Sequence, residues 1–287
     1  MDQIPVNDIL SDIGFDRHVA AEVVTGGADA LLWRLRAGDK SFALRLLRTD
    51  QKPQAQREIS LSHWVNKHAP NLAVPQMIRS GTWNDRPAYV MDWVEGRTLG
   101  EAAMDPTLGS AALEKLASGF GELQAQIHLM PVPRGIDTIA NSWLKKVSDP
   151  ALAERLSSVQ TSQMALLHLD YHPLNVMVNG SEIVAVLDWA NAAAGDPQFD
   201  LARTQAIVEL APVPPSTDIS SLKLLLKDWK SGYERIRGPI VIDPAVYWWA
   251  GTLIEHELTP RIGNPAIPWL DQAFIERVQE WTNAFRT

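Results

Sequence analysis

The apolar pattern of the chain changes near residue 91, and this change limits the folds that the chain can adopt. Before it, short runs rich in β-branched and aromatic residues alternate with turn residues, which is typical of a meander of antiparallel strands. Beyond Gly96, apolar residues recur with helical spacing, as in the stripe from Leu113 to Ile127. The sequence therefore predicts a β-rich part followed by an α-rich part, with the boundary between Met91 and Gly96.

The first ninety or so residues predict the order β-β-β-α-β-β after a short initial helix. Turn residues at Gly26-Gly27 and at 38–40 separate the first three strands, and Asn84-Asp85 separates the last two. Pro53 marks the start of a helix, because proline is favoured in the first helical turn. The expected elements are a helix over 6–15, three strands within 21–48, a helix from Pro53 to about His68, and strands over 76–83 and 86–94.

Composition excludes several classes of protein. The chain has 287 residues, of which 46% are hydrophobic, so it can bury a sizeable core. A net charge of −8 argues against a nucleic-acid partner, and the absence of cysteine removes disulfides, zinc–thiolate sites and cysteine nucleophiles. No apolar run approaches the roughly 18 residues of a membrane span, and the acidic N-terminus does not resemble a secretion signal. We therefore expect a cytoplasmic enzyme without a membrane partner.

A polar segment, His168-Leu169-Asp170-Tyr171-His172-Pro173-Leu174-Asn175, carries most of the chemical information. Apolar residues typical of strands lie on both sides of it, so its side chains are expected on a rigid turn between strands. Asp188 follows a second predicted strand over 183–187. A hairpin that turns at Asn179-Gly180 would return Asp188 to the end where Asn175 lies.

The residue types in this segment suit phosphoryl transfer. An amide oxygen from Asn175 and a carboxylate from Asp188 are hard ligands of the kind that Mg²⁺ prefers. Asp170, on the same turn, could accept a proton from a hydroxyl nucleophile. The pattern H-x-D-x-x-x-x-N followed by a strand-end aspartate is that of a kinase catalytic loop and its metal ligand.

The motifs resemble those of the aminoglycoside phosphotransferase family, whose members are similar to protein kinases and act on small molecules. The family signatures H-G-D-x-H-x-x-N, I-D-W and G-D-P-x-x-D-L-A are similar to HLDYHPLN, LDWA and GDPQFDLAR here. The resemblance implies that Asp170 is the catalytic aspartate and that Asn175 and Asp188 are metal ligands. It also implies that Asp200 caps and holds the loop. Leu169 and Ala190 stand where the family commonly has glycine and often glutamate.

A weaker resemblance covers the β-rich part. Phe42-Ala43-Leu44-Arg45 resembles the strand whose last basic residue binds the α- and β-phosphates, with Ala43 beneath the adenine. The basic residue here is arginine instead of the usual lysine, which keeps the charge and offers a bidentate grip. Glu58 is the only acid between Asp50 and Asp85, so it is the expected partner of Arg45.

Further positions follow from the same resemblance. Gly26-Gly27 resembles the turn that covers the phosphates, and the backbone of Asp92 and Val94 would meet the adenine edge. The C-terminal helices are where the family builds its acceptor site. The weak candidates for substrate binding there are Trp248, Trp249, Glu255 and Glu257.

The resemblance implies a bilobal, protein-kinase-like α+β fold. A small antiparallel sheet with one helix would form a nucleotide-binding N-lobe over 1–91, followed by a hinge over 92–97. A larger, mainly helical C-lobe over 98–287 would hold the catalytic loop and the acceptor. The implied reaction uses ATP and Mg²⁺ and moves the γ-phosphate to a hydroxyl of a small molecule.

Two alternative functions remain open on the sequence. Arg45 and Leu169 are compatible with a nucleotide-binding module that has little catalysis. His168, Asp170 and His172 could instead be ligands of a metal-dependent hydrolase.

The distribution of charge bears on the acceptor. Residues 1–91 carry 11 basic and 10 acidic side chains, whereas residues 92–287 carry 15 and 24. The acidic excess in the second part would favour a cationic acceptor such as an aminoglycoside or an amino alcohol, or it is simply a soluble acidic surface.

Overall fold

The computed structural model describes residues 4–24, 30–69, 72, 74–161, 163–212 and 220–286. Its internal contacts divide the chain into two compact units. The smaller unit comprises Met1–Gly96 and Val184–Asn191, and the larger unit comprises Arg97–Ile183 and Ala192–Thr287. The smaller unit thus includes a short segment from late in the sequence, and this segment contains Asp188.

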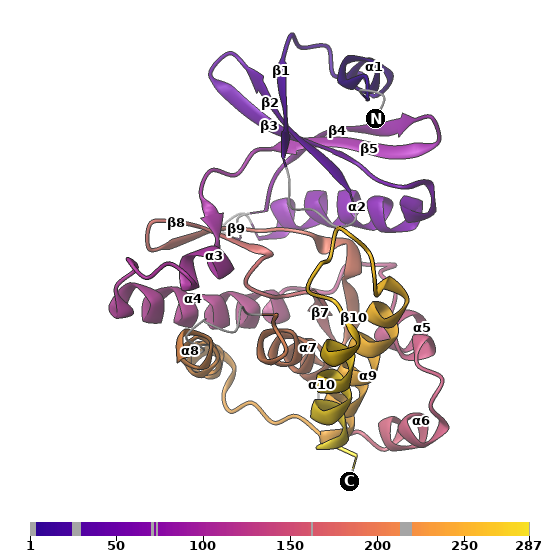
Figure 1. The fold of residues 1–287 in the computed structure, drawn as a ribbon, viewed down its shortest axis with the longest axis vertical. Helices are drawn as coiled ribbons and strands as arrows, with labels where there is room; N and C mark the ends of the chain where they lie inside the picture. The colour runs from indigo at the N-terminus through magenta and orange to yellow at the C-terminus, as the bar shows by residue number, and fades with distance from the viewer. Residues whose placement is uncertain are drawn as a thin grey trace. The chain divides into compact units, whose positions relative to one another are not determined.

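The smaller unit contains a five-stranded sheet in the order β1-β2-β3-β5-β4, with every described neighbour antiparallel (Figure 1). The predicted succession of strands and helices in this part of the chain is confirmed. Asn84 and Asp85 turn β4 into β5 with φ of 47° and 63°, a left-handed conformation that Asn and Asp tolerate better than most residues. The elements are α1 (Val6–Asp12), β1 (Ala20–Val24), β2 (Leu31–Ala37), β3 (Lys40–Leu46), η1 (Thr49–Gln51), α2 (Lys52–His68), β4 (Met77–Trp83), β5 (Arg86–Asp92) and η3 (Trp189–Asn191).

The two faces of this sheet carry different sets of side chains, because successive side chains of a strand point to opposite faces. Leu44 of β3 and Val90 of β5 belong to an apolar cluster that also contains Ile9 and Leu10 of α1. Tyr89 of β5 belongs to a second cluster, which contains Ala55 of α2. Figure 1 shows α1 and α2 on opposite sides of the sheet. The face toward α2 is the one that carries polar groups.

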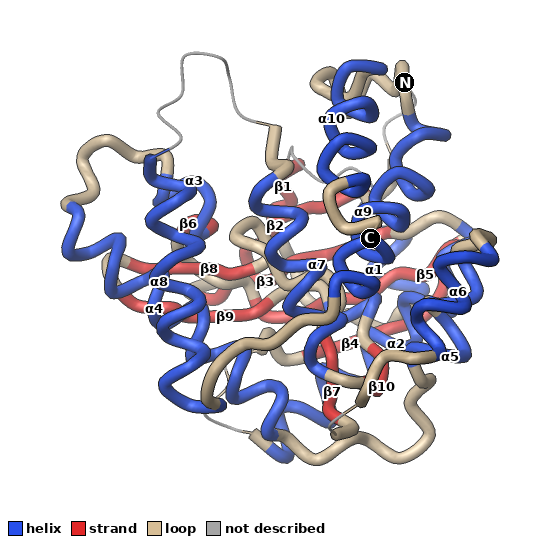
Figure 2. The backbone as a smooth tube through the Cα atoms, turned by 90° about the horizontal axis from the view of Figure 1, so that it is seen from below, coloured by secondary structure: helices blue, strands red, loops and turns tan. Residues whose placement is uncertain are grey.

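The larger unit is mainly helical, and its helices from α3 to α10 are drawn in blue in Figure 2. Its helices are α3 (Leu99–Ala103), α4 (Ser110–Leu129), α5 (Ile139–Ser142), η2 (Leu144–Lys146), α6 (Pro150–Ser157), α7 (Pro197–Glu209), α8 (Ser220–Arg237), α9 (Pro244–Leu258), η4 (Thr259–Arg261) and α10 (Gln272–Asn283). Its short strands are β6 (Arg97–Thr98), β7 (Ala165–Leu167), β8 (Val176–Asn179) and β10 (Ala193–Gly195). Strand β9 (Glu182–Val186) starts in the larger unit and ends in the smaller one. No helix among these described segments is both long and apolar enough to cross a membrane.

The core of the larger unit surrounds helix α9. Phe199 of α7, Trp249 of α9 and Val278 of α10 belong to one buried cluster, and the rings of Phe199 and Trp249 meet edge to face. Leu167 of β7 and Leu169 belong to the same cluster, so the residues before Asp170 are anchored in the core. The polar loop therefore begins from a rigid base.

Helices α4 and α8 pack closely because each has a glycine where it meets the backbone of the other. A Cβ atom on Gly121 of α4 would lie 1.9 Å from the carbonyl oxygen of Trp229, and one on Gly232 of α8 would lie 2.0 Å from that of Ser118. No other residue type fits at such distances from a backbone atom. The close approach brings α8 side chains to α4: Trp229 donates a 2.8 Å hydrogen bond to Gln124.

Candidate active site

Arg45, on β3 of the smaller unit, joins two carboxylates. Its Nη1 donates to both oxygens of Glu58, at 2.8 and 3.1 Å, and its Nη2 donates to Oδ2 of Asp188 at 3.3 Å. Burial alone would lower the pKa of Arg45, but Glu58, Tyr89 and Asp188 raise it above its usual value. Arg45 therefore keeps its charge, and the structure brings together three of the residues singled out from the sequence: Arg45, Glu58 and Asp188.

Tyr89 is a fourth member of this group that sequence reasoning missed. It lies directly opposite Arg45 in the β3–β5 register, and its hydroxyl donates to Oε2 of Glu58. Its ring centroid lies 5.6 Å from the guanidinium carbon of Arg45. Burial and the charge of Glu58 raise the pKa of Tyr89 well above its usual value, so the hydroxyl stays protonated and remains a donor. We call Arg45, Glu58, Tyr89 and Asp188 the Arg45 cluster.

The carboxylate of Glu58 is enclosed. Its side chain is 5% exposed, compared with 32% for that of Asp188. Burial raises the pKa of Glu58, the Arg45 charge opposes this shift, and the Asp188 charge adds to it. The less buried Asp188 is thus the carboxylate of the cluster that a ligand in solvent can reach.

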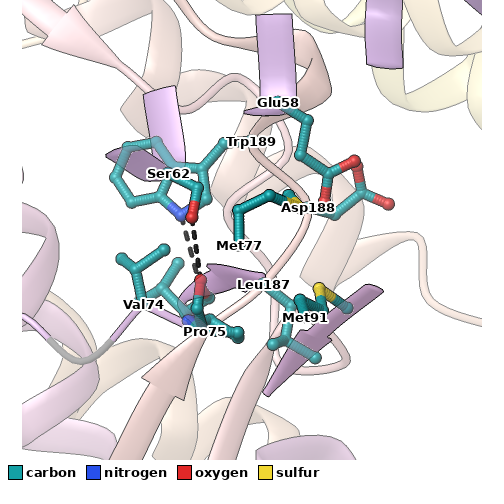
Figure 3. A pocket seen from close by; sticks show the side chains of 10 residues that line it. Glu58, Ser62, Val74, Pro75, Met77, Met91, Leu187, Asp188 and Trp189 are labelled. Carbon is teal, nitrogen blue, oxygen red and sulfur yellow. Dashed lines mark hydrogen bonds between the residues drawn. The ribbon is translucent and has the colours of Figure 1, made fainter. Parts of the chain in front are cut away.

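A small, mainly apolar pocket lies beside Glu58 and Asp188 within the smaller unit (Figure 3). Ser62 of α2 forms part of the pocket wall and donates a 2.8 Å hydrogen bond to the carbonyl of Pro75. Arg57 of α2 also donates, at 2.7 Å, to the carbonyl of Ala190. The Arg57 bond holds the segment Val184–Asn191 against α2, and it uses only the backbone of Ala190. The lining residues are Glu58, Ser62, Val74, Pro75, Met77, Met91, Val186, Leu187, Asp188 and Trp189.

The other predicted nucleotide-binding positions lie around β3 and β5. Ala43 is buried in β3, two residues before Arg45 and on the same face. The N–H of Asp92 donates to the carbonyl of Gln76 at 3.0 Å, and Val94 is half-buried beyond the end of β5. Gly26 and Gly27 lie outside the described residues.

Asp170 and Asn175 lie together in the larger unit. The side-chain nitrogen Nδ2 of Asn175 donates to the backbone carbonyl of Asp170 at 2.9 Å and lies 3.4 Å from Oδ2 of the same residue. His172 joins them, because its Nε2 lies 3.2 Å from the Asn175 nitrogen and 3.5 Å from Oδ1 of Asp170. Because these contacts use Nδ2, Oδ1 is the atom of Asn175 that could act as a metal ligand. Asn175 belongs to the larger unit and Asp188 to the smaller one.

The residue before Asp170 departs from the family pattern, and the structure shows how it is accommodated. Leu169 has φ of 61°, a left-handed conformation that glycine adopts without cost, and its side chain is fully buried. Its N–H donates to Oδ1 of Asp200 at 2.6 Å, and its carbonyl accepts from Nε of Arg203 at 2.8 Å. The backbone next to Asp170 is therefore held on both sides, and packing of the Leu169 side chain contributes to the same anchor.

Asp200 is the centre of a buried polar network. Gln124 and His128 of α4 contact its Oδ2 at 3.1 and 2.9 Å, and His128 reaches Tyr233 of α8 through its other ring nitrogen at 2.8 Å. Burial would raise the pKa of Asp200, but hydrogen bonding and charge from His128, with help from His168 and Gln124, lower it below its usual range. The carboxylate thus stays ionised inside the core, and the network links the 168–175 loop to α4 and α8.

The two aspartates of the G-D-P-x-x-D run make different contacts. Asp196, and not Asp200, is the N-cap of α7, because its side chain accepts from the N–H of Gln198 at 3.1 Å. Asp200 lies within the first turn of α7 and instead holds the loop, as expected. The G-D-P-x-x-D run thus contains two aspartates with two separate tasks.

The four candidate acceptor residues lie on α9, and their surroundings differ. Trp249 is wholly buried in the core and Trp248 is 8% exposed. Glu257 pairs with Arg203 at 3.2 Å and with Lys146 at 3.7 Å, while Glu255 accepts a hydrogen bond from Gln279. The two carboxylates are therefore already engaged by side chains of the same chain.

Several solved structures have a similar fold. An aminoglycoside phosphotransferase APH(4)-Ia, in a ternary complex with AMP-PNP and hygromycin B, is 14% identical with a TM-score of 0.66, over 99% of this chain and 98% of that one. An aminoglycoside-3′-phosphotransferase of type VIII is 17% identical with a TM-score of 0.66, over 88% and 99%. A spectinomycin phosphotransferase APH(9)-Ia, in complex with ADP and spectinomycin, is 14% identical with a TM-score of 0.59, over 98% and 93%. The fold is thus the protein-kinase-like α+β fold of small-molecule kinases, as predicted.

The family is shown by the sequence. Residues 20–238 match the model of the phosphotransferase enzyme family, which covers most of the chain. The chain belongs to this family, and it is a kinase-type phosphotransferase of small molecules. A search of the curated proteins found no match.

Proposed function

We propose that this phosphotransferase moves the γ-phosphate of ATP to a hydroxyl group of a small cationic molecule, with Asp170 as the catalytic residue. The observation that carries the proposal is the arrangement of Asp170 and Asn175, whose side chains contact each other on a loop anchored by Asp200 and Arg203. A loop held in this way keeps its reactive groups in position before the substrate arrives.

The smaller unit is proposed to bind the nucleotide. Arg45 would hold the α- and β-phosphates through charge-assisted hydrogen bonds, supported by Glu58. Since the N–H of Asp92 is used by Gln76, its carbonyl and the N–H of Val94 are the proposed contacts of the adenine edge. Ala43 would lie beneath the base, and Gly26-Gly27 would cover the phosphates.

Asn175 and Asp188 are the residues that would hold Mg²⁺. Their donor atoms fit a hard cation, because the hydrogen bonds of Nδ2 leave Oδ1 of Asn175 as the ligand atom and Asp188 offers a partly exposed carboxylate. When bound, Mg²⁺ supplies positive charge that offsets the charge on the transferring phosphates.

Asp170 is proposed to orient the acceptor hydroxyl and to take its proton. Phosphoryl transfer needs little covalent assistance, so most of the rate enhancement would come from position and electrostatics. The contact between Asn175 and the carboxylate of Asp170 would hold that carboxylate in one orientation. Two residues of the loop would thus share the task of positioning, and one of them would do the proton chemistry.

The acidic excess of residues 92–287 supports a cationic acceptor, such as an aminoglycoside or an amino alcohol. Glu255 and Glu257 are engaged by Gln279, Arg203 and Lys146. We therefore assign this preference to the electrostatic field of residues 92–287 as a whole and not to that pair. The hydrolase alternative has no further support: among the residues with described positions, no group of three or more His, Asp or Glu side chains is placed to hold a metal ion.

The test is ADP release with Mg-ATP against a panel of acceptors. The panel pairs aminoglycosides and amino alcohols with neutral sugars and with diols that lack the amine. We expect turnover with at least one amine, a KM that rises with salt, and little turnover with its neutral counterpart. Turnover with neutral acceptors alone would contradict the cationic preference. Nucleotide binding without ADP release on any acceptor would favour the nucleotide-binding module instead.

A further inference from the structure

We infer that Tyr89 is a positioning residue for the nucleotide: it holds Glu58 so that Arg45 is aimed at the phosphates. This inference rests on the proposed nucleotide-binding role of Arg45. Tyr89 does not contact the nucleotide in this scheme, because it acts through Glu58.

The geometry places Tyr89 at both ends of the Arg45–Glu58 pair. It is the cross-strand partner of Arg45, so its ring lies beside the arginine stem, with the guanidinium carbon 5.6 Å from the ring centroid. Its hydroxyl reaches past the arginine to Oε2 of Glu58, which comes from α2. One side chain of the sheet thus contacts the strand cation and the helix anion together.

The hydrogen bonds divide the guanidinium between two tasks. Oε2 of Glu58 accepts from Tyr89 and from Nη1 of Arg45 at 3.1 Å, and Oε1 accepts from the same nitrogen at 2.8 Å. Nη1 is therefore committed to Glu58, while Nη2 points to Asp188 at 3.3 Å. Nη2 is the nitrogen that can turn to a phosphate when a nucleotide is bound.

This division depends on the orientation of the Glu58 carboxylate. A glutamate held by one guanidinium nitrogen alone can rotate about its last torsion, which is broad in proteins. The tyrosine hydroxyl supplies a second, differently directed donor, and two donors from β3 and β5 define the plane of the carboxylate. An arginine needs this more than a lysine does, since its planar fork binds well only in defined directions.

The effect of the Tyr89 hydroxyl on nucleotide binding must be measured apart from that of the ring, because the ring also packs in the core. Tyr89 is fully buried and belongs to the apolar cluster with Ala55 and Met77. Tyr89→Phe removes the hydroxyl and keeps the ring. A matched control is Tyr247→Phe on α9, which removes a hydroxyl that donates at 2.7 Å to Gln205 in the larger unit.

The first experiment measures the Kd for ADP by calorimetry and kcat with saturating Mg-ATP, for the parent and both variants. We expect Tyr89→Phe to weaken ADP binding about three- to tenfold, the effect of one buried hydrogen bond, with kcat changed less than the KM for ATP. Tyr247→Phe is expected to leave the Kd for ADP unchanged. Equal Kd values for the parent and Tyr89→Phe would overturn the inference.

A double-mutant cycle then tests the path through Glu58. In the Glu58→Gln background, Tyr89→Phe is expected to add less than half of its effect on the Kd for ADP, since the carboxylate that it holds is gone. Full additivity would mean that Tyr89 acts in another way, and it would overturn the inference. A parent protein that does not bind ADP would instead refute the proposed function, so the two failures are distinguishable.

Discussion

Leu169, the residue before Asp170, donates a 2.6 Å hydrogen bond from its N–H to the carboxylate of Asp200. Through this bond, a charge in the core of the larger unit controls the backbone that presents the catalytic candidate. The same carboxylate contacts His128 and Gln124 of α4, so the loop and the helix share one anchor.

Asp200→Asn is predicted to reduce both stability and turnover. The substitution replaces an ionised acceptor by an amide whose NH₂ group would face other donors, and breaking one side of a buried network costs about 3 kcal/mol. Urea denaturation monitored by tryptophan fluorescence measures the loss. Asp243→Asn is the control, because Asp243 caps α9 and asparagine caps a helix as well as aspartate does. A fully stable Asp200→Asn variant would show that the network is not an anchor.

The stability of the parent is also predicted to fall in acid, and Asp200 accounts for part of this loss. Its pKa is lowered in the folded state, so its contribution is present above the pKa of the unfolded state, about 3.9, and disappears as the pH falls through the folded value. The unfolding free energy measured from pH 7 to pH 3 should therefore decrease less in Asp200→Asn than in the parent. Parallel pH curves for the two proteins would contradict this assignment.

Asp170→Asn is predicted to abolish ADP release while nucleotide binding stays nearly intact. The amide cannot take the hydroxyl proton, whereas the nucleotide contacts are assigned to other residues. The measurement is a coupled assay for ADP release together with calorimetry of Mg-ATP binding. Unchanged turnover would refute the role of Asp170, and loss of nucleotide binding would show that this aspartate acts on the metal or the phosphates instead.

Arg45→Lys and Arg45→Met are both predicted to weaken nucleotide binding, and Arg45→Met is also predicted to lower stability. Lysine keeps the charge, but its one nitrogen cannot occupy the two positions that Nη1 and Nη2 hold beside Glu58 and Asp188, so we expect the KM for ATP to rise about tenfold. Methionine leaves Glu58 buried without its cation, which is predicted to cost about 3 kcal/mol of stability in addition to nucleotide affinity. Steady-state kinetics and thermal unfolding separate the two effects. Identical KM values for arginine and lysine would show that the fork is not used.

Gly121→Ala is predicted to destabilise the larger unit, and Gly119→Ala is its matched control on the same helix. A methyl group at position 121 would overlap the backbone of Trp229, which requires α4 and α8 to separate and costs about 2 kcal/mol or more. At position 119 the nearest atom is a side-chain methyl of Ile183 at 3.4 Å, so alanine gains helix propensity, up to about 1 kcal/mol. Thermal unfolding of the two variants should therefore shift in opposite directions.

The fold was largely predictable, because its local signals agree with one another. Helix α2 begins at Lys52, one residue before the expected start at Pro53, and Asn84-Asp85 forms the expected turn. The first helix is shorter than expected: it ends at Asp12 since Gly14 adopts a left-handed φ of 69°. A glycine can continue a helix or stop one, and only the packed structure shows which.

The site was predictable where a short list of candidates existed. Glu58 could be paired with Arg45 because no other acid lies in that part of the sequence, and the structure brings the two together. The role of Tyr89 was not visible, because it depends on a strand register and on the reach of a helix residue at once. The contact of His128 with Asp200 was hidden for a similar reason, since it joins residues far apart in the sequence. The assignments of Asp170, Asn175 and Asp188 to catalysis and metal binding stay predictions.

The late segment Val184–Asn191 has a practical consequence for anyone who wishes to divide the protein. The chain passes between the units three times, so a fragment that stops at Gly96 loses Asp188, the wall formed by Trp189, and the carbonyl that Arg57 binds. Such a fragment would expose the pocket residues that Leu187 and Trp189 face, and it would leave Arg45 with one carboxylate instead of two. A smaller unit made by simple truncation would thus be incomplete, whereas one in which residues 184–191 are joined back through a designed linker would restore every contact of the Arg45 cluster.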